Sequence, residues 1–295
     1  MNDIVLVPTY YRPEYLSLAL EYLSKARGIE NKEVWVCQDF RQHDEHRHLI
    51  EEQWTAAVID EWRKKLSIRF IRSAPHIFQG NTQNVMEAYK RAYVTDAKFV
   101  YLVEDDVFVM PDFFEWHEAV QAEDNYFCSV AYRCIRNQEA RNDVHDPNAY
   151  FTSKRDYASI GVAWKRENLK PLVEHATPEY YSDTDGYMTK KFPGNRFGEC
   201  FSEQDGLIMR LLWQQDATVA WCYVPRAYHM GWYGYHRPNG FRPNGHLDQK
   251  IQALRSMISD GERLKTAAPD YGDIEPFPQY DISEWHKLYK IQHFD

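Results

Sequence analysis

The sequence predicts an α/β protein built on a doubly wound parallel sheet. Over residues 3–103, short apolar segments alternate with longer segments whose apolar residues recur at helical spacing. Neighbouring parallel strands need a crossover of about a dozen residues or more, which a helix usually supplies. The apolar run at 99–103 shows no alternation, as is typical of a strand buried on both faces. We therefore expect helices on both sides of the sheet.

The N-terminal elements follow from this pattern and from their boundary residues. Strands are predicted at 3–7 and 33–37, with a helix at 14–27 between them. Pro13 suits the start of this helix and Gly28 suits its end. The elements predicted next are a helix within 43–65, a strand at 68–71, a helix at 81–94 and the strand at 99–103.

Beyond residue 106 the pattern is less regular. Asp112 can cap a helix at 113–121. The other predicted elements are strands at 127–132, 158–164 and 218–223 and helices at 207–213 and 247–265. Two stretches have no clear period, 136–157 and 177–200, and we expect them to be loops or excursions, which in compact domains are often functional.

Composition and charge restrict the class of protein. The 295 residues are 44% hydrophobic, which is ample for a globular core, and no apolar run approaches the ~20 residues of a membrane span. The formal charge of -9 argues against a general nucleic-acid coat, because phosphate binding normally requires a basic surplus. The N-terminus lacks the segments of a secretory signal, so we expect a cytoplasmic protein. Five scattered cysteines indicate reduced thiols.

Three adjacent carboxylates, Glu104, Asp105 and Asp106, follow the apolar strand at 99–103. In an open α/β sheet the carboxyl ends of the strands form the edge where ligands bind. Adjacent acids repel one another unless they share a cation, and their oxygens suit Mg²⁺ or Mn²⁺. The run therefore indicates either a metal site that holds a diphosphate or a solvated strand end that carries acids by chance.

Several motifs place the acidic run in a more specific context. They lie at strand ends and in one helix, and they are Pro8-Thr9-Tyr10-x-Arg12-Pro13, Asp39, Asn84 and Glu104-Asp105-Asp106. In this order and spacing, residues 3–235 resemble the GT-A glycosyltransferases of the inverting family-two type. The Glu-Asp-Asp motif followed by Pro111-Asp-Phe-Phe114 is also similar to that of N-acetylglucosaminyltransferase I, which initiates complex N-glycans. The departures are Gln38-Asp39, where two aspartates are usual, and Glu203-Gln204-Asp205, where a Glu-Asp pair is common.

The resemblance implies a Rossmann-like mixed sheet flanked by helices, with a helical and aromatic C-terminal extension. Residues 1–235 would form the GT-A catalytic domain. Within it, residues 1–106 would bind the nucleotide-sugar and residues 107–235 the acceptor. Residues 236–295 would be the extension packed on this domain.

The resemblance also implies the residues that bind the donor and the metal. Those around the donor nucleotide would be Pro8, Thr9, Tyr10, Arg12, Asp39, Asn84, Glu104 and Asp105. Asp106 would ligate Mn²⁺ or Mg²⁺, and His229 would complete the metal site, with a slight preference for Mn²⁺. Asp39 can accept a hydrogen bond from a uracil N–H, so a UDP-sugar is the favoured donor. Arg12 could equally be a structural partner for a carboxylate.

Transfer to a hydroxyl acceptor needs a base as well as a cation. A divalent ion neutralises the charge that builds on the leaving diphosphate, whereas the incoming hydroxyl must lose a proton. In the inverting mechanism the base approaches from the opposite face, so it comes from another part of the chain. Asp205 is the preferred base and Glu203 the second candidate. Either acid could instead only complement the dipole at the start of a helix.

The acceptor is less well defined. Its candidate residues are Gly161, Trp232, Tyr233, His236 and Arg237, and the last four belong to an aromatic and cationic cluster that suits stacking on a sugar or a base. The overall acidity favours a saccharide. The alternative is a hydroxymethylated pyrimidine flipped out of DNA, the substrate of some phage glycosyltransferases. No obligate protein partner is inferred.

Two other classes of protein remain open. A sugar-1-phosphate nucleotidyltransferase would use similar acids but normally has a glycine-rich basic loop after its first strand, and residues 9–12 contain no glycine. A non-catalytic sugar-binding protein would keep the aromatic cluster without needing the acids at 104–106 and 203–205. Pyrophosphate release would identify the first class. Sugar binding that ignores metal and nucleotide would identify the second.

Overall fold

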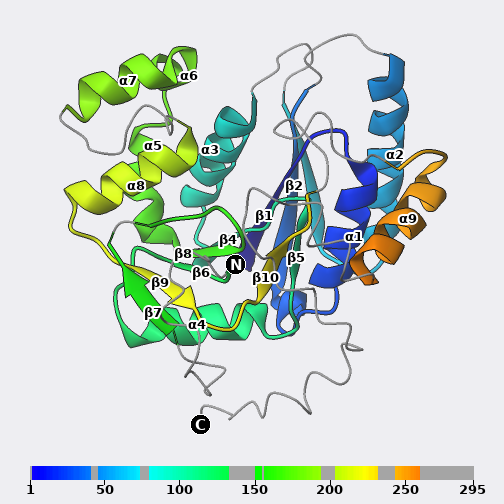
Figure 1. Cartoon of the computed structure of the whole chain (residues 1–295), viewed down its shortest axis with the longest axis horizontal. Helices are drawn as coiled ribbons and strands as arrows, with labels where there is room; N and C mark the ends of the chain where they lie inside the picture. Colours follow the sequence, from blue (N-terminus) through cyan, green and yellow to red (C-terminus); the bar gives the residue numbers. More distant parts are fainter. Residues whose placement is uncertain are drawn as a thin grey trace.

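The protein is a central mixed sheet with helices on both faces (Figure 1). The computed structural model describes residues 2–40, 46–73, 80–132, 150–154, 156–193, 203–231 and 243–259. The sheet has the strand order β3-β2-β1-β4-β8-β6-β9-β7. Its strands are β1 (Asp3–Thr9), β2 (Lys32–Gln38), β3 (Ile68–Arg72), β4 (Phe99–Leu102), β6 (Cys128–Val130), β7 (Tyr150–Ser153), β8 (Val162–Lys165) and β9 (Val219–Cys222).

Strand direction changes across the sheet. The strands β3, β2, β1 and β4 are parallel, but β8 runs antiparallel to both β4 and β6, and the edge strand β7 runs antiparallel to β9. The parallel arrangement predicted from residues 3–103 is confirmed for β1 to β4, and antiparallel pairing begins at β8. The apolar pattern of β8 does not set its direction, because a strand buried on both faces has the same pattern in either direction. The mixed sheet implied by the family resemblance is confirmed.

Two hydrophobic cores lie on opposite faces of the sheet. Along β1, Val5 and Val7 point into one core, and Ile4 and Leu6 point into the other. This alternation is what a strand covered on both faces requires. The first core lies under α1 (Pro13–Leu23), α2 (His46–Trp62) and α4 (Phe113–Glu123). The second lies under α3 (Gly80–Tyr93), α5 (Lys170–Glu174), α6 (Pro178–Ser182), α7 (Thr184–Lys191) and α8 (Gln204–Gln214).

A small second sheet closes the molecule beside α1. It consists of β5 (Val107–Val109) and β10 (Ala227–His229), which pair antiparallel with His229 opposite Val107. The last described helix, α9 (Leu247–Ser259), packs against α1 (Figure 1). Leu254 of α9 is buried in an apolar cluster with Phe108 of β5 and Met230 just after β10. This sheet brings the segment around residue 229 next to the acidic run that ends at residue 106.

Most predicted elements are present, and two predictions of irregular structure are wrong. Strand β7 lies inside the predicted loop at 136–157, and its half-exposed residues carry no apolar alternation. Helices α6 and α7 lie inside the predicted irregular stretch at 177–200. Both helices are short and are started by caps rather than by a periodic apolar face. Thr177 accepts a hydrogen bond from the amide of Tyr180, and Asp183 accepts one from the amide of Gly186.

The cysteines that the structure describes are buried and free. They are Cys37, Cys128 and Cys222, and burial raises the pKa of Cys37 to about 12. Cys134 and Cys200 lie outside the described residues.

Within the described ranges, no helix has the length and apolar character needed to cross a membrane.

Candidate active site

The carboxyl ends of β1, β2 and β4 meet at one edge of the sheet. Thr9 lies opposite Gln38 of β2, and Leu6 lies opposite Leu102 of β4. Past the end of β4, the amide of Asp105 donates to the carbonyl of Pro8 at 3.3 Å, so the acidic run continues alongside β1. The run then turns at Asp105 and Asp106, where the amide of Val107 donates to the carbonyl of Glu104 at 2.9 Å. The edge therefore gathers the predicted residues of the first strand end and the three acids.

Asp105 is fully buried and binds the segment that follows β1. Its Oδ2 accepts a hydrogen bond from Thr9 Oγ1 at 2.6 Å, and its Oδ1 pairs with Nη2 of Arg12. Burial raises the pKa of Asp105 to about 6, although the Arg12 charge and the Thr9 hydroxyl oppose this shift. Both oxygens of Asp105 thus bind groups of the segment at the end of β1, and these contacts hold that segment in place.

Arg12 bridges two of the three acids. Besides its pair with Asp105, its Nη1 lies 2.7 Å from Asp106 Oδ2. The preceding residue, Tyr11, has φ +47°, an uncommon conformation for a residue with a side chain that turns the chain just before α1. The guanidinium carbon lies 5.3 Å from the centre of the Tyr15 ring. Burial lowers the pKa of Arg12, but the two carboxylates outweigh it and raise that pKa well above its usual value.

Asp106 lies beside His229. The Nε2 atom of His229 is 3.5 Å from Asp106 Oδ2, and the amide of Met230 donates to the Asp106 carbonyl at 2.7 Å. Gly231 leaves room for this pair, because a Cβ atom there would come within 2.7 Å of Asp106 Oδ2 and 2.9 Å of His229 Nε2. Burial raises the pKa of Asp106, but Arg12 and His229 outweigh it and hold that pKa well below its usual range.

Asp106 and His229 fit a divalent-ion site that is completed by a phosphate ligand. The second oxygen of Asp106, Oδ1, is buried and has no hydrogen-bond partner within the described part of the chain. Mg²⁺ and Mn²⁺ at nucleotide sites commonly take only one or two protein carboxylates, because phosphate oxygens and water supply the other ligands. Among the described residues, no group of three or more His, Cys, Asp or Glu side chains forms a metal site on its own.

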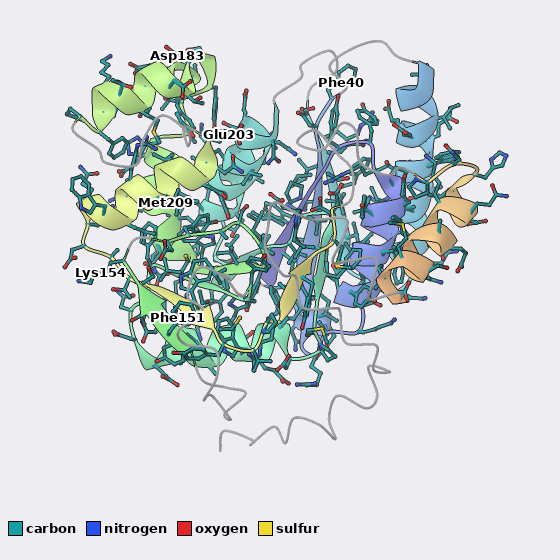
Figure 2. The ribbon with its side chains drawn as sticks, viewed as in Figure 1. Phe40, Phe151, Lys154, Asp183, Glu203 and Met209 are labelled. Carbon is teal, nitrogen blue, oxygen red and sulfur yellow. The ribbon has the colours of Figure 1, made fainter. Side chains whose placement is uncertain are left out.

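The end of β2 carries Asp39, which is buried and hydrogen-bonded locally. Its Oδ2 accepts from the amide of Gly80 at 2.7 Å, and its Oδ1 accepts from the amide of Phe40 at 2.7 Å and from Ser73 Oγ at 3.2 Å. Asn84 of α3 donates to the carbonyl of Cys37 at 3.1 Å. Asp39 and Asn84 thus tie the start of α3 to the end of β2. Phe40 marks that strand end near the top of the view in Figure 2.

Asp205 lies in the first turn of α8, apart from the Asp106 and His229 pair. Its Oδ2 accepts a hydrogen bond from Ser159 Oγ at 3.3 Å, and its Oδ1 has no partner among the described residues. Burial raises the pKa of Asp205 to about 7; the Glu203 carboxylate adds to this shift and the Ser159 hydrogen bonds oppose it. A carboxyl with a pKa near 7 can accept a proton at neutral pH.

Glu104 connects these two acidic groups electrostatically. It is half-buried, and its Oε1 has no hydrogen-bond partner in the described ranges. Burial, together with the carboxylates of Asp106 and Asp205, raises the pKa of Glu104 well above its usual value. Glu104 is therefore within electrostatic range of both Asp106 and Asp205.

Glu203, the second candidate base, has a different environment from Asp205. It lies at the start of α8 (Figure 2), and its side chain is exposed and makes no capping hydrogen bond. Gln204 next to it is buried and accepts from Thr82 Oγ1 at 2.8 Å, which ties α8 to α3. The α3–α8 contact fixes the orientation of the turn that carries Asp205.

The candidate acceptor residues are only partly described. Gly161 has φ +62° and is buried, and a Cβ atom there would collide with Ala227 and approach Phe113 within 3.2 Å. Its missing side chain therefore lets β10 and α4 pack closely around it. Trp232, Tyr233, His236 and Arg237 lie outside the described residues.

Three structurally important residues were not predicted as site residues. Ser159 holds Asp205, Gly231 gives space to Asp106 and His229, and Tyr11 turns the chain before Arg12. Gly231 stands two residues after the predicted ligand His229, which is the one local signal that could have identified it. A serine or a tyrosine in a loop carries no such signal.

Comparison with known proteins identifies the fold. The fold is the predicted GT-A type, and it is shared with a solved structure of TarS. No protein-family model matches the chain, and no curated protein is detectably similar in sequence. Residues 1–349 of TarS from S. aureus, in complex with UDP-GlcNAc, give a TM-score of 0.52 at 14% identity, over 92% of this chain and 73% of that one. The mannosyltransferase PcManGT from Pyrobaculum calidifontis, in complex with GDP-Man and Mn²⁺, gives a TM-score of 0.47 at 14% identity. The match covers 98% of this chain and 84% of the PcManGT chain. At 14% identity the likeness to TarS establishes the fold alone.

Proposed function

We propose that the protein is a glycosyltransferase that moves a sugar from a nucleoside-diphosphate sugar to an acceptor hydroxyl. One observation supports the proposal: two carboxylates of opposite character, Asp106 and Asp205, both act electrostatically on Glu104, which follows β4. Asp106 has a pKa held well below its usual range and lies beside His229, which suits a cation. Burial raises the pKa of Asp205 to about 7, which suits a proton acceptor. Sugar transfer from a diphosphate leaving group needs both.

The donor diphosphate would lie at the N-terminus of α1, beside Arg12 and the Asp106–His229 pair. A helix N-terminus favours anions, and the Arg12 guanidinium is a bidentate phosphate donor. A bound Mn²⁺ or Mg²⁺ would neutralise the charge that develops on the leaving phosphate. The nucleoside would extend over the ends of β1 and β2, where Thr9, Tyr10 and Asp39 lie. TarS has been solved with UDP-GlcNAc, which supports UDP-sugars as the first donors to test.

Asp205 would act as the general base. In the transfer step the acceptor oxygen forms a bond to the anomeric carbon while the bond from that carbon to the phosphate oxygen breaks. The bonding electrons leave with the diphosphate, and the acceptor proton moves to Asp205. Oδ1 of Asp205, which has no partner among the described residues, is the atom available to receive it, because Ser159 already donates to Oδ2. A base separate from the cation site favours inversion at the anomeric carbon.

The acceptor we propose is a saccharide. The formal charge of -9 disfavours close approach of a nucleic-acid backbone, whereas a neutral glycan meets no such repulsion. The start of α8, with Asp205 and the exposed Glu203, would face this acceptor. A sugar-1-phosphate nucleotidyltransferase is less consistent with the site, because the segment after β1 carries Arg12 bound to two acids in place of a glycine-rich loop.

The proposal is tested by measuring sugar transfer from UDP-sugars, in the presence of Mn²⁺, to two kinds of acceptor. The full chain is incubated separately with oligosaccharides and with DNA that contains hydroxymethylated cytosine, and products are identified by mass spectrometry. Addition of a hexose or N-acetylhexosamine to an oligosaccharide, with release of UDP, is the expected result. Addition to the DNA would change the acceptor and retain the transferase. Pyrophosphate release from a nucleoside triphosphate and a sugar phosphate would overturn the proposal.

A further inference from the structure

We infer that Arg12 is a resident counter-ion of Asp106 that gives up this carboxylate when a divalent cation binds and then pairs with the donor diphosphate. Arg12 would thereby act as a positioning residue that couples cation binding to donor binding. The inference rests on the proposed function and extends it, because it assigns the residue that makes the two binding events depend on each other.

The first reason is that one oxygen atom faces two partners. Asp106 Oδ2 accepts from Arg12 Nη1 at 2.7 Å, and the same atom lies 3.5 Å from His229 Nε2. A cation held between Asp106 and His229 would be close to this oxygen. The guanidinium and the cation are both positive, so they cannot occupy the same position on Asp106 Oδ2 without strong repulsion. One must move, or share the carboxylate at a cost in affinity.

The second reason is that Arg12 has a second anchor. Its guanidinium also pairs with Asp105, which Thr9 holds at 2.6 Å, and it lies over the buried Tyr15 ring. The Arg12 side chain is 20% exposed, whereas the side chains of Asp105 and Asp106 are 0% and 7% exposed. Arg12 therefore lies on the solvent side of the acids, from which a ligand would approach. It can leave Asp106 while Asp105 and Tyr15 keep its stem in place.

The third reason is the charge at the site. Two ionised carboxylates and one guanidinium leave a net charge of minus one at Asp105, Asp106 and Arg12. A divalent cation changes this to plus one, which disfavours the cation alone and favours the cation together with an anion. A diphosphate supplies that anion and offers Arg12 the bidentate oxygens that it loses on Asp106. Because coupling of binding free energies is reciprocal, the donor must strengthen cation binding by the same factor.

A charge-matched double variant separates this exchange from simple electrostatics. Arg12→Met with Asp105→Asn removes the guanidinium and one carboxylate together, so the site keeps the net charge of the wild type and no buried acid loses its only partner. The single variant Asp105→Asn is the matched control, since it keeps Arg12 on Asp106. Mn²⁺ alone is titrated into each full-length protein, free Mn²⁺ is measured by electron paramagnetic resonance, and folding is checked by circular dichroism.

We expect the double variant to bind Mn²⁺ at least about tenfold more tightly than the wild type, because a charge-assisted contact no longer competes for Asp106. The Asp105→Asn control should show no such gain. Adding UDP should strengthen Mn²⁺ binding in the wild type and do so much less in the double variant. If the double variant does not fold, Arg12→Lys serves instead, because a single ammonium cannot bridge both acids. Its Mn²⁺ affinity should lie between that of the wild type and the roughly tenfold higher affinity expected for the double variant.

Equal Mn²⁺ affinity in the wild type and in whichever variant folds would overturn the exchange, whatever UDP does. Undiminished UDP coupling in the double variant would also overturn it, because another residue would then link the two sites. Failure of UDP to bind the wild type under any condition would instead contradict the proposed function. The titration with Mn²⁺ alone would still decide whether Arg12 and a cation compete for Asp106.

Discussion

The hydroxyl of Ser159 donates a hydrogen bond to Oδ2 of Asp205 at 3.3 Å. The other carboxylate oxygen of Asp205, Oδ1, has no hydrogen-bond partner among the described residues. Ser159 lies in the segment that leads into β8, and Asp205 lies in the first turn of α8, so two elements that are distant in sequence meet at this carboxylate. A base that is oriented by a second group and keeps one oxygen open is the arrangement that proton abstraction requires.

Replacing Asp205 by Asn should reduce turnover by about 10²–10⁴-fold, because the amide cannot accept the acceptor proton. The substitution keeps the shape and an oxygen for Ser159, so the affinity for UDP with Mn²⁺ should not change. Steady-state kinetics and calorimetry measure these two quantities. Glu203→Gln is the control, because this exposed side chain should contribute little. If Glu203→Gln abolishes transfer and Asp205→Asn does not, the two assignments are reversed.

The pH dependence of the reaction should report Asp205 directly. Burial raises its pKa to about 7, so kcat/KM should increase with pH and level off above that value, and Asp205→Asn should remove the inflection. Ser159→Ala should move the inflection to higher pH, because the hydrogen bonds from Ser159 favour the ionised carboxylate. An inflection that does not move in Ser159→Ala would contradict the contact between these two residues.

Stability should depend on pH through the same carboxylate. An acid whose pKa is raised by folding binds its proton more tightly in the native state, so its contribution to stability is greatest at low pH. That contribution declines as the pH rises from about 4 through about 7. Asp205→Asn should therefore be more stable than the wild type at pH 8, by on the order of 2 kcal/mol, and the difference should shrink toward pH 4. Urea unfolding at the two pH values measures this. A variant that is less stable at pH 8 would contradict the raised pKa.

Gly231→Ala should weaken cation binding without removing any ligand. The added methyl group would lie 2.7 Å from Asp106 Oδ2 and 2.9 Å from His229 Nε2, so the pair must separate. We expect a loss in Mn²⁺ affinity of at least about tenfold, in the range seen when the surroundings of metal ligands are altered. Gly28→Ala is the control, because Gly28 has φ +85° and open space around it, so this variant loses stability away from the site. Similar Mn²⁺ affinity in Gly231→Ala and the wild type would show that the pair is not a cation site.

The sequence predicts the first half of the sheet well, because its signals are local. The apolar run at 99–103 ends in three acids, and this abrupt change of residue type predicts that Asp105 and Asp106 follow a strand end, although both are buried. The direction of β8 could not be predicted in the same way. Val162 and Ala163 are fully buried, and their pattern fits parallel and antiparallel pairing equally well. Direction depends on the path of the connecting chain, which apolar periodicity does not record.

The sequence predicts which residue types lie at the site, but it does not predict which of them contact one another. The sequence places Arg12 and Asp39 at strand ends, but their partners depend on distances across the sheet. Arg12 binds Asp105 and Asp106, some ninety residues away in sequence, and Asp39 caps the start of α3 through Gly80. The positions of Ser159 and Gly231 also depend on tertiary packing. Such contacts leave no periodic trace in a single sequence.

The most direct test of the account is a thermal-shift comparison of UDP, GDP, dTDP and CMP, each with Mn²⁺ and with EDTA, on the wild type and on Asp106→Asn. A nucleotide present at about 100 times its dissociation constant stabilises the native state by about 2.7 kcal/mol, which raises the unfolding temperature measurably. We predict a shift with one nucleoside diphosphate, UDP foremost, that requires Mn²⁺ and is lost in Asp106→Asn. No shift with any nucleotide, or a shift that persists in EDTA and in Asp106→Asn, would contradict a cation-dependent nucleotide-sugar site at this sheet edge.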